Sequence, residues 1–557
     1  VAAADRAVAK LNKFHLTKTD VFQVNRWSDF TDAEYTPDDY EPLEEDELER
    51  ATTTELTNPM MSDRLGRPQI MVKAGDNFDI NWSYLFPNTG KLEPVKPTHD
   101  LQPWAAEDRR AKKLQPGMPT PLPMWSPQGT FVITQEKGAI KLWGGKGTGL
   151  VCEFPAPEAR YVQMSPCEKY LVIYGREFNF WDVGTSRLIA TIPGEAPFWP
   201  VFKYNADDSL CATFSRERGT VLVFKADTME LQTEDLPPRF TIKEEGMCAF
   251  AWSPTNPNVF AYAVAGDENT GFRVQIDKIT LFEDTEDSKN MCEVRQLCRR
   301  NYFGTAQLDL LWHPMGNFLA AKITKTTGQM AYGIFRVQQH SASAEALEVK
   351  GEPIRFAWQP NAGRFGIILS ETKTAKQRIC FHEMTKPGFK DVGTFPSGGV
   401  RLFWAPKGTR CVAVNYNTSR LEFYGVQGCG PFASDQKMTA IASVEHPMIT
   451  DAEWDPTGRF LCSWVSSLKQ QMDNAWMVWN VNGQKIFEQK IGKLSHCAWR
   501  PLAPSLLMPE DLQRLKAQLP AKSQKYKEEA LAVQRKADEQ TASKKKTLLE
   551  KYRNTMD

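Results

Sequence analysis

Short apolar runs separated by turn residues recur along most of the chain. In the clearest example, Trp454 ends one apolar run, Pro456 and Gly458 follow it, and Phe460 begins the next run. Proline cannot donate a hydrogen bond to a β-ladder, and glycine accepts a positive φ without steric cost. A further run ends at Asn482-Gly483, a dipeptide typical of two-residue hairpins. The pattern predicts a meander of short antiparallel strands.

The same turn returns along the chain as an aromatic-X-Pro motif, roughly every 40 to 50 residues. Weaker copies begin at Met164 and Tyr204, and the copies with tryptophan stand at Trp125, Trp252, Trp312, Trp358, Trp404, Trp454 and Trp499. Each repeat then closes with an apolar-aromatic strand, such as the one that ends in Val478-Trp479. A period of this length with several strands per unit is typical of a β-propeller, in which each sheet buries its faces against its neighbours. The motif tryptophans are therefore expected in the blade cores.

Counting these motifs predicts an all-β, nine-bladed, WD40-like propeller over residues 69–504. The motif at Trp499 has no strand after it, whereas Ile70–Val72 and Phe78–Trp82 precede the first motif. We expect these two N-terminal strands to complete the ninth blade and close the ring, which removes exposed strand edges. An eight-bladed ring with one irregular insertion is the alternative.

The segments that flank the ring differ from it in composition. Residues 28–68 are rich in Asp and Glu and contain prolines, so they predict a solvated acidic linker. Residues 505–557 predict a helical tail, in which Leu512, Leu515 and Leu519 fall on one face of a helix. Pro520 interrupts that helix. The ring is complete before these leucines, so we expect them to dock on another protein, with Lys516, Tyr526 and Lys527 at the rim.

Composition and motifs argue against catalysis. Lys+Arg and Asp+Glu both number 68, so nucleic-acid contact is expected only through local patches, for example Arg109, Arg110, Lys112 and Lys113. The 11 cysteines form no C-x-x-C pair, and the 7 histidines show no metal-ligand spacing. His313, inside Trp-His-Pro, is expected to be a turn residue. We therefore expect no enzyme activity, no metal and no cofactor.

No apolar run is long enough to span a membrane, and reduced thiols fit a cytoplasmic protein.

Several stretches resemble the b subunit of eukaryotic translation initiation factor three. The resemblance is carried by Asp451–Arg459, Asp473–Trp476 and Trp499–Pro501, and Leu16–Asn25 is similar to the end of that family's RNA-recognition-motif-like domain. It extends over essentially the whole chain. It implies that residues 1–27 are the C-terminal part of that α/β domain.

The resemblance also implies a non-catalytic, RNA-binding scaffold that contacts the 40S ribosomal subunit during translation initiation. In that family the N-terminal domain engages the a and j subunits, and the C-terminal helix engages the i and g subunits. Two other interpretations stay open: the related propeller of initiation factor two A, and a propeller adaptor of another multiprotein assembly.

Overall fold

The computed structural model describes residues 2–12, 14–15, 21–22, 58–63, 67–75, 77–84, 91–94, 511, 514–515, 517–518 and most of 123–504. The gaps within 123–504 fall at 137, 146–147, 216–218, 230–239, 267–270, 282–291, 339–340, 348–350, 372–375, 386–387 and 427–436. The chain divides into two compact units, residues 1–55 and residues 56–557.

The first unit contains a helix and a small strand pair. Helix α1 (Ala2–Leu11) is followed by β1 (Phe14–His15) and β2 (Val21–Phe22), which pair antiparallel with Phe14 opposite Phe22. A helix followed by a strand agrees with the order that the sequence indicates. Its assignment to an RNA-recognition-motif-like domain stays a prediction.

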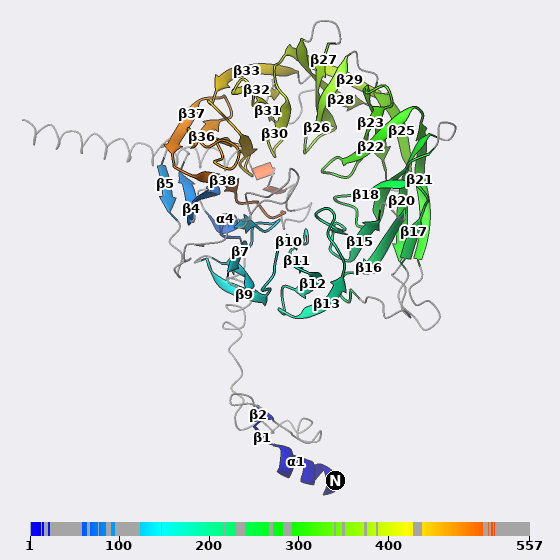
Figure 1. Cartoon of the computed structure of the whole chain (residues 1–557), viewed down its shortest axis with the longest axis vertical. Helices are drawn as coiled ribbons and strands as arrows, with labels where there is room; N and C mark the ends of the chain where they lie inside the picture. Colours follow the sequence, from blue (N-terminus) through cyan, green and yellow to red (C-terminus); the bar gives the residue numbers. More distant parts are fainter. Residues whose placement is uncertain are drawn as a thin grey trace, which may run out of the picture. The chain divides into compact units, whose positions relative to one another are not determined.

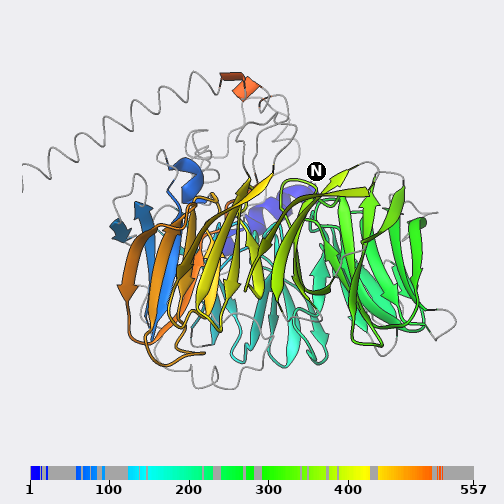
Figure 2. The same cartoon turned by 90° about the horizontal axis from the view of Figure 1, so that it is seen from above.

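In the second unit the described strands form nine four-stranded antiparallel sheets. The sheets follow one another around a common axis (Figure 1), and in side view their strands run between two faces of the ring (Figure 2). We number the sheets 1 to 9 in chain order, and in all but the last the four strands are consecutive.

The strands of sheets 1 to 4 have the following bounds. Sheet 1 comprises β6 (Met124–Trp125), β7 (Val132–Glu136), β8 (Ala139–Gly144) and β9 (Gly149–Pro155). Sheet 2 comprises β10 (Tyr161–Met164), β11 (Tyr170–Tyr174), β12 (Glu177–Asp182) and β13 (Leu188–Pro193). Sheet 3 comprises β14 (Phe202–Tyr204), β15 (Leu210–Ser215), β16 (Thr220–Lys225) and β17 (Phe240–Lys243). Sheet 4 comprises β18 (Met247–Trp252), β19 (Val259–Val264), β20 (Phe272–Leu281) and β21 (Cys292–Tyr302).

The next four sheets repeat the same order. Sheet 5 comprises β22 (Thr305–Trp312), β23 (Phe318–Lys325), β24 (Met330–Val337) and β25 (Ala342–Leu347). Sheet 6 comprises β26 (Glu352–Trp358), β27 (Arg364–Ser370), β28 (Gln377–Thr385) and β29 (Gly388–Pro396). Sheet 7 comprises β30 (Arg401–Trp404), β31 (Arg410–Asn415), β32 (Arg420–Val426) and β33 (Met438–Glu445). Sheet 8 comprises β34 (Asp451–Trp454), β35 (Phe460–Trp464), β36 (Ala475–Asn480) and β37 (Lys485–Lys490).

The place of the apolar-aromatic strand differs from the sequence-based expectation. That strand is third in each of these sheets, as β36 is in sheet 8, and a fourth strand follows it. The expectation that it closes each repeat is wrong. The fourth strands, for example β37, lie at the sheet edge and carry mostly exposed or half-buried residues, so they lack the apolar pattern by which a strand is recognised.

Sheet 9 joins the two ends of the ring. Its first strand is β38 (Leu494–Trp499), which pairs antiparallel with β3 (Gln69–Ala74), and β4 (Asn77–Tyr84) and β5 (Lys91–Pro94) follow. Ile70 lies opposite Trp499, and Val72 lies opposite Cys497. The predicted completion of this sheet by the N-terminal strands is therefore found: β3 pairs directly with the Trp499 strand, and β4 pairs with β3.

The core consists of apolar layers between successive sheets. Nine buried clusters occur among the described residues, and each is shared by two neighbouring sheets. The cluster between sheets 8 and 9 contains Trp464, Trp476 and Trp499, and the cluster between sheets 9 and 1 contains Met71 and Trp125. Each sheet contributes one apolar face to each of two layers, so the stability of every layer depends on both of the sheets that form it.

Deleting β3 and β4 tests whether closure stabilises the ring. Removal of residues 1–84 leaves β38 without its partner strand and opens the apolar layers on both sides of sheet 9, so we expect the melting temperature to fall by more than about 10 °C. Removal of residues 1–55 takes away the first compact unit alone and serves as the matched control, with a melting temperature close to wild type. Equal melting temperatures for the two deletions would show that closure contributes nothing.

Candidate functional site

The motif tryptophans link successive sheets through their indole nitrogens. In six copies the indole N–H donates to a backbone carbonyl of the preceding sheet, at 3.0 to 3.3 Å. The accepting carbonyl belongs to the residue that immediately precedes the motif aromatic residue of the preceding sheet. For example, Trp454 of sheet 8 donates to the carbonyl of Phe403, which precedes Trp404 of sheet 7. The donors are Trp125, Trp252, Trp312, Trp358, Trp404 and Trp454. Each bond satisfies an indole N–H inside an otherwise apolar layer.

These rings are also largely buried, which agrees with the core role expected from their place before proline. All the motif tryptophans are less than one-tenth exposed except Trp312, which is half-buried. The junction between sheets 8 and 9 departs from the pattern: the Trp499 indole N–H has no partner among the described residues, and the Trp499 backbone N–H donates to Glu453 Oε2 at 3.1 Å. Burial raises the pKa of the Glu453 carboxyl to about 7.

The residue after the motif aromatic organises its own turn. Asp455 Oδ1 accepts hydrogen bonds from the backbone N–H groups of Arg459 and Phe460, both at 2.7 Å. Ser126 and Asn205 cap their turns in the same way, by accepting from the residue five positions later. The turn is therefore held by a short polar side chain, which explains why a polar residue often stands between a buried aromatic residue and proline.

Several of these turns also bond to the turn of the next sheet. His313 Nε2 lies 2.8 Å from the Gln359 carbonyl and 3.0 Å from the Ala362 carbonyl, while its Nδ1 accepts from Met315 N–H. The ring is therefore the neutral Nε2–H tautomer, and burial lowers the pKa of His313. His313 is a turn residue, as the sequence indicated. We call the side of the ring that carries these turns the turn face.

Arg500 joins sheet 9 to sheet 1 on the turn face. Its side chain is 2% exposed and donates to the Gly129 carbonyl (2.5 Å), the Thr130 carbonyl (2.9 Å) and Gln69 Oε1 (2.7 Å). Its guanidinium carbon lies 4.7 Å from the centre of the Trp125 ring, a cation–π distance. Its backbone N–H donates to the Gln69 carbonyl at 2.9 Å. Burial lowers the pKa of Arg500 to about 9.

A second side chain, Asn58, strengthens the same junction. It precedes helix α4 (Pro59–Ser62) and accepts from Met60 N–H as its N-cap. Its amide nitrogen donates to the Pro501 carbonyl (2.9 Å) and the Gln128 carbonyl (3.1 Å). Gly129 has φ +72°, and a Cβ there would lie 2.2 Å from the Pro501 oxygen, so this close approach requires glycine. Sequence reasoning missed Arg500 and Asn58; the one signal for Arg500 was its place between Trp499 and Pro501.

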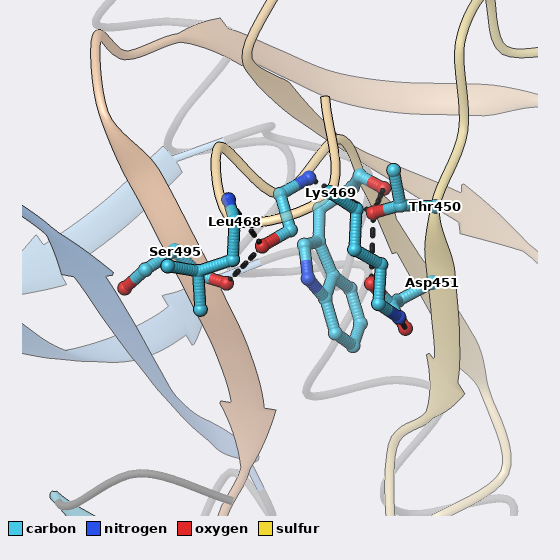
Figure 3. A network of polar contacts seen from close by, with 7 residues as sticks. Thr450, Asp451, Leu468, Lys469 and Ser495 are labelled. Atoms are coloured by element: carbon cyan, nitrogen blue, oxygen red, sulfur yellow. Dashed lines mark hydrogen bonds and ion pairs between the residues drawn. The ribbon is translucent and has the colours of Figure 1, made fainter. Parts of the chain in front are cut away.

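On the face of the ring opposite the turn face, a loop of sheet 8 forms hydrogen bonds to sheet 9. Ser466 Oγ donates to the Ser495 carbonyl at 2.6 Å, and Ser466 N–H donates to Thr450 Oγ1 at 2.8 Å. Lys469 forms an ion pair with Asp451 at the start of β34 (Figure 3). The loop is held firmly, yet it presents Leu468 and Met472 to solvent.

His446, in the loop between sheets 7 and 8, forms a buried polar chain with Ser463 and Trp479 of sheet 8. Trp479 Nε1 donates to Ser463 Oγ at 2.7 Å, and Ser463 Oγ lies 2.8 Å from His446 Nδ1. The serine oxygen accepts from Trp479 and keeps one hydrogen to donate, so it can donate to Nδ1 of a neutral histidine. Burial lowers the pKa of His446 to about 4.

The other predicted site residues are not brought together by the described part of the chain. Leu515 is a half-buried helical residue. The remaining predicted partner-binding and RNA-binding residues lie outside the described residues: Leu512, Lys516, Leu519, Tyr526, Lys527, Arg109, Arg110, Lys112 and Lys113. Among the described residues, no group of three or more His, Cys, Asp or Glu side chains could hold a metal ion, and no helix is long and apolar enough to cross a membrane.

Comparisons with known proteins agree with this fold. A family model described as eukaryotic translation initiation factor eIF2A matches residues 300–497. A solved structure described as a crystal structure of the eukaryotic initiation factor superposes with a TM-score of 0.60 at 15% identity, over 79% of this chain and 100% of that one. At that identity the superposition speaks for the fold alone. Together with the ring of sheets, the superposition supports a β-propeller fold, and the family match adds a similarity to a translation initiation factor over residues 300–497.

Two curated relatives show more specifically which initiation factor the chain resembles. The b subunit of eukaryotic translation initiation factor 3 from Mycosarcoma maydis is 26% identical over 597 residues, covering 95% of this chain and 76% of the relative. The protein of the same name from Schizosaccharomyces pombe is 25% identical over 626 residues, covering 100% of this chain and 80% of the relative. The chain is thus similar along nearly its whole length to the b subunit of initiation factor 3, which confirms the resemblance seen in the sequence.

Replacing Arg500 tests the junction between sheets 9 and 1. Arg500→Met keeps the length of the side chain but leaves two buried carbonyls and the Gln69 amide oxygen without their donor, so we expect a loss of at least about 3 kcal/mol of unfolding free energy. Denaturant titration measures it. The control is Arg420→Met, because Arg420 is 51% exposed and pairs at 3.4 Å with a Glu445 side chain that is 66% exposed; its loss should stay below about 1 kcal/mol. Similar losses for both variants would contradict the assigned role of Arg500.

The buried His446 predicts a stability that falls with acid. Its folded pKa of about 4 lies below the ordinary histidine value of 6.5, so its contribution is fully present above pH 6.5 and is lost as pH falls toward 4. The difference corresponds to about 3 kcal/mol. His446→Asn retains an acceptor for Ser463 but does not titrate, so the drop in unfolding free energy between pH 7 and pH 4 should be smaller than in wild type. Parallel pH profiles for the two proteins would exclude this role.

Proposed function

We propose that this chain is a non-catalytic scaffold subunit of eukaryotic translation initiation factor three, corresponding to its b subunit. The observation that carries the proposal is the similarity to curated subunits of that name over 95 to 100% of the chain. The fold supports it, because a closed ring of sheets is a rigid platform with many exposed loops. Buried polar groups such as Asp455, His313 and Arg500 bond within turns and across sheet junctions, which stiffens this platform.

In the proposed organisation a nine-bladed propeller occupies residues 69–504. Residues 1–27 end an RNA-recognition-motif-like domain, residues 28–68 link it to the ring, and residues 505–557 form a helical partner-binding tail. The nine sheets among the described residues support this blade count. The contacts of Asn58 with Gln128 and Pro501 add that the end of the linker segment lies against the ring.

The proposed partners are other subunits of the factor and the 40S ribosomal subunit, in the cytoplasm. The tail would engage the i and g subunits, through the leucine stripe of Leu512, Leu515 and Leu519 with Lys516, Tyr526 and Lys527 around it. The N-terminal domain would engage the a and j subunits. The basic cluster from Arg109 to Lys113 would contact ribosomal RNA, because lysine and arginine bind phosphate groups irrespective of sequence.

A related propeller, initiation factor two A, is the second candidate. It is favoured by one observation, the match of its family model to residues 300–497. That match leaves the N-terminal unit, the first sheets and the tail uncovered, whereas the relatives from factor three cover them. The two candidates differ in whether the chain co-purifies with the other subunits of factor three.

Affinity purification of the tagged chain from an extract of its own organism tests the proposal. Wild type should recover factor-three subunits and 40S particles. Replacing Leu512, Leu515 and Leu519 with Asp should remove the i subunit at least tenfold while 40S particles are retained, because charge on the apolar face prevents helix docking. Gln513, Ala517 and Gln518 lie away from this stripe, so their replacement with Asp is the matched control.

Each result bears on a different part of the proposal. Recovery of the i subunit with the leucine variant at wild-type yield would contradict the tail assignment alone. A wild-type preparation without any factor-three subunit would contradict the proposed function and favour the second candidate.

A further inference from the structure

Two arginines occupy equivalent positions on neighbouring inner strands of sheets 6 and 7. Arg355 on β26 and Arg401 on β30 each lie three residues before the motif tryptophan of their sheet, and both side chains are exposed. The strands β26 and β30 contact each other. Three residues of strand span about 10 Å, so both arginines lie toward the face opposite the turn face. We propose that Arg355 and Arg401 form a docking site for an acidic peptide segment of a partner protein.

The charges on the two flanking strands are already paired. The same position carries Asp309 on β22 of sheet 5 and Asp451 on β34 of sheet 8. Asp309 forms an ion pair with Lys322 at 3.3 Å, and Asp451 forms one with Lys469 (Figure 3). Along the four successive inner strands β22, β26, β30 and β34, this position therefore carries Asp, Arg, Arg and Asp. Each aspartate forms an ion pair with a lysine.

The two arginines have no such partner. Within the part of the chain that the structure describes, neither guanidinium has a hydrogen bond or an ion pair, and the charge of Arg401 acts unfavourably on Arg355. Partial burial, and then this neighbouring charge, lower the pKa of Arg355. Two like charges held together without a counter-charge are destabilising, and a bound carboxylate relieves the repulsion while accepting charge-assisted hydrogen bonds from both.

Aromatic hydroxyls border the pair. Tyr332 on β24 is 3% exposed; burial raises its pKa to about 12, and the charge of Arg355 opposes the shift. Tyr416 follows β31; burial and the Asp451 charge raise its pKa to about 12, and Arg401 and Arg355 oppose this. Tyr332 is therefore within electrostatic range of Arg355, and Tyr416 is within range of both arginines. Both hydroxyls stay protonated at neutral pH, and Tyr416, which is half-buried, offers a neutral hydrogen-bond donor, whereas Tyr332 is buried.

Two exposed apolar side chains of sheets 7 and 8 lie on the same face of the ring as the arginines. Met448 is 47% exposed, and its backbone N–H donates at 2.9 Å to Ser419 Oγ, in the same turn as Tyr416. Leu468 is 49% exposed and precedes Lys469, the partner of Asp451. Large apolar side chains exposed on the same face as an unpaired basic pair fit a peptide that carries both acidic and apolar residues.

The charge pattern favours a peptide over a nucleic acid. A nucleic-acid strand carries a phosphate at every nucleotide and binds along an extended basic track. Here the excess positive charge is confined to two adjacent strands, with Asp309 on one side and Asp451 on the other. Such a site holds one or two carboxylates, whereas the flanking strands offer only aspartates that lysines already neutralise, so the continuation of a polyanion finds no unpaired cation on them.

Fluorescence anisotropy with the full chain tests the proposal. The probe is a fluorescein-labelled nonapeptide, three repeats of Glu-Glu-Leu, and its Gln-Gln-Leu counterpart is the uncharged control. We expect the double variant Arg355→Gln, Arg401→Gln to weaken binding of the acidic probe at least tenfold. The matched control is Arg299→Gln, Arg300→Gln on β21, where both side chains are exposed; it removes the same charge and should change binding less than twofold. Circular dichroism melts check that both variants fold.

The outcomes separate the alternatives. Loss of the acidic probe in the Arg355 and Arg401 variant alone supports the site. No binding of this probe to wild type, or equal loss in both variants, overturns it. A labelled decauridylate that binds wild type more tightly than the peptide, and is lost in the same variant, overturns it in favour of RNA. An at least tenfold gain in peptide affinity after removal of residues 1–55 overturns it in favour of the chain's own acidic segment.

Discussion

Pairing between the last strand of the ring and the first is the constraint on which the rest of the structure depends. Each sheet packs on two neighbours, so an open ring leaves one apolar face exposed at each end. β38 and β3 close it with an antiparallel ladder from Ala74 opposite Leu494 to Ile70 opposite Trp499, with one register shift between Lys73 and Ala74. Arg500 and Asn58 then bond sheet 9 to the first turn of sheet 1. Arg500 also bonds to Gln69 on β3, so its side chain reinforces the pairing of β38 with β3, the point at which the ring joins strands from its two sequence ends.

The motif tryptophan combines two contributions at the other junctions. Its ring fills the apolar layer, and its indole N–H donates to the preceding sheet, as Trp358 does to Leu311 and Trp404 to Ala357. The hydrogen bond adds direction to an interaction that is otherwise non-directional. It therefore fixes the height at which one sheet packs on the next, and that regular height brings Arg355 and Arg401 to the same level.

The repeat and its closure were accessible from the sequence because they depend on local signals. An aromatic residue before X-Pro, a glycine and an apolar strand recur at a period that can be recognised in the sequence. In addition, two strands precede the first motif at Trp125 and no strand follows the last motif at Trp499, which indicates that the early strands complete the last sheet. The fourth strands were not accessible, since edge strands such as β37 bury too little to carry an apolar pattern. Arg500, Asn58 and the Arg355–Arg401 pair were missed for another reason. Their partners or neighbours are distant in sequence, so the signal exists only once the ring has formed.

The separation of β3 from β38 has a consequence for synthesis of the protein. Gln69 and Arg500 bond to each other across 431 residues, so a ribosome that adds about 5–20 residues per second exposes β3 for roughly 20 to 90 s before its partner exists. During that time the nascent chain can build sheets 1 to 8 in order, but it carries an unpaired strand edge at its beginning and an apolar face at its growing end. Both surfaces stay exposed until β38 has been synthesised, so the unfinished ring is more prone to aggregation than the closed one.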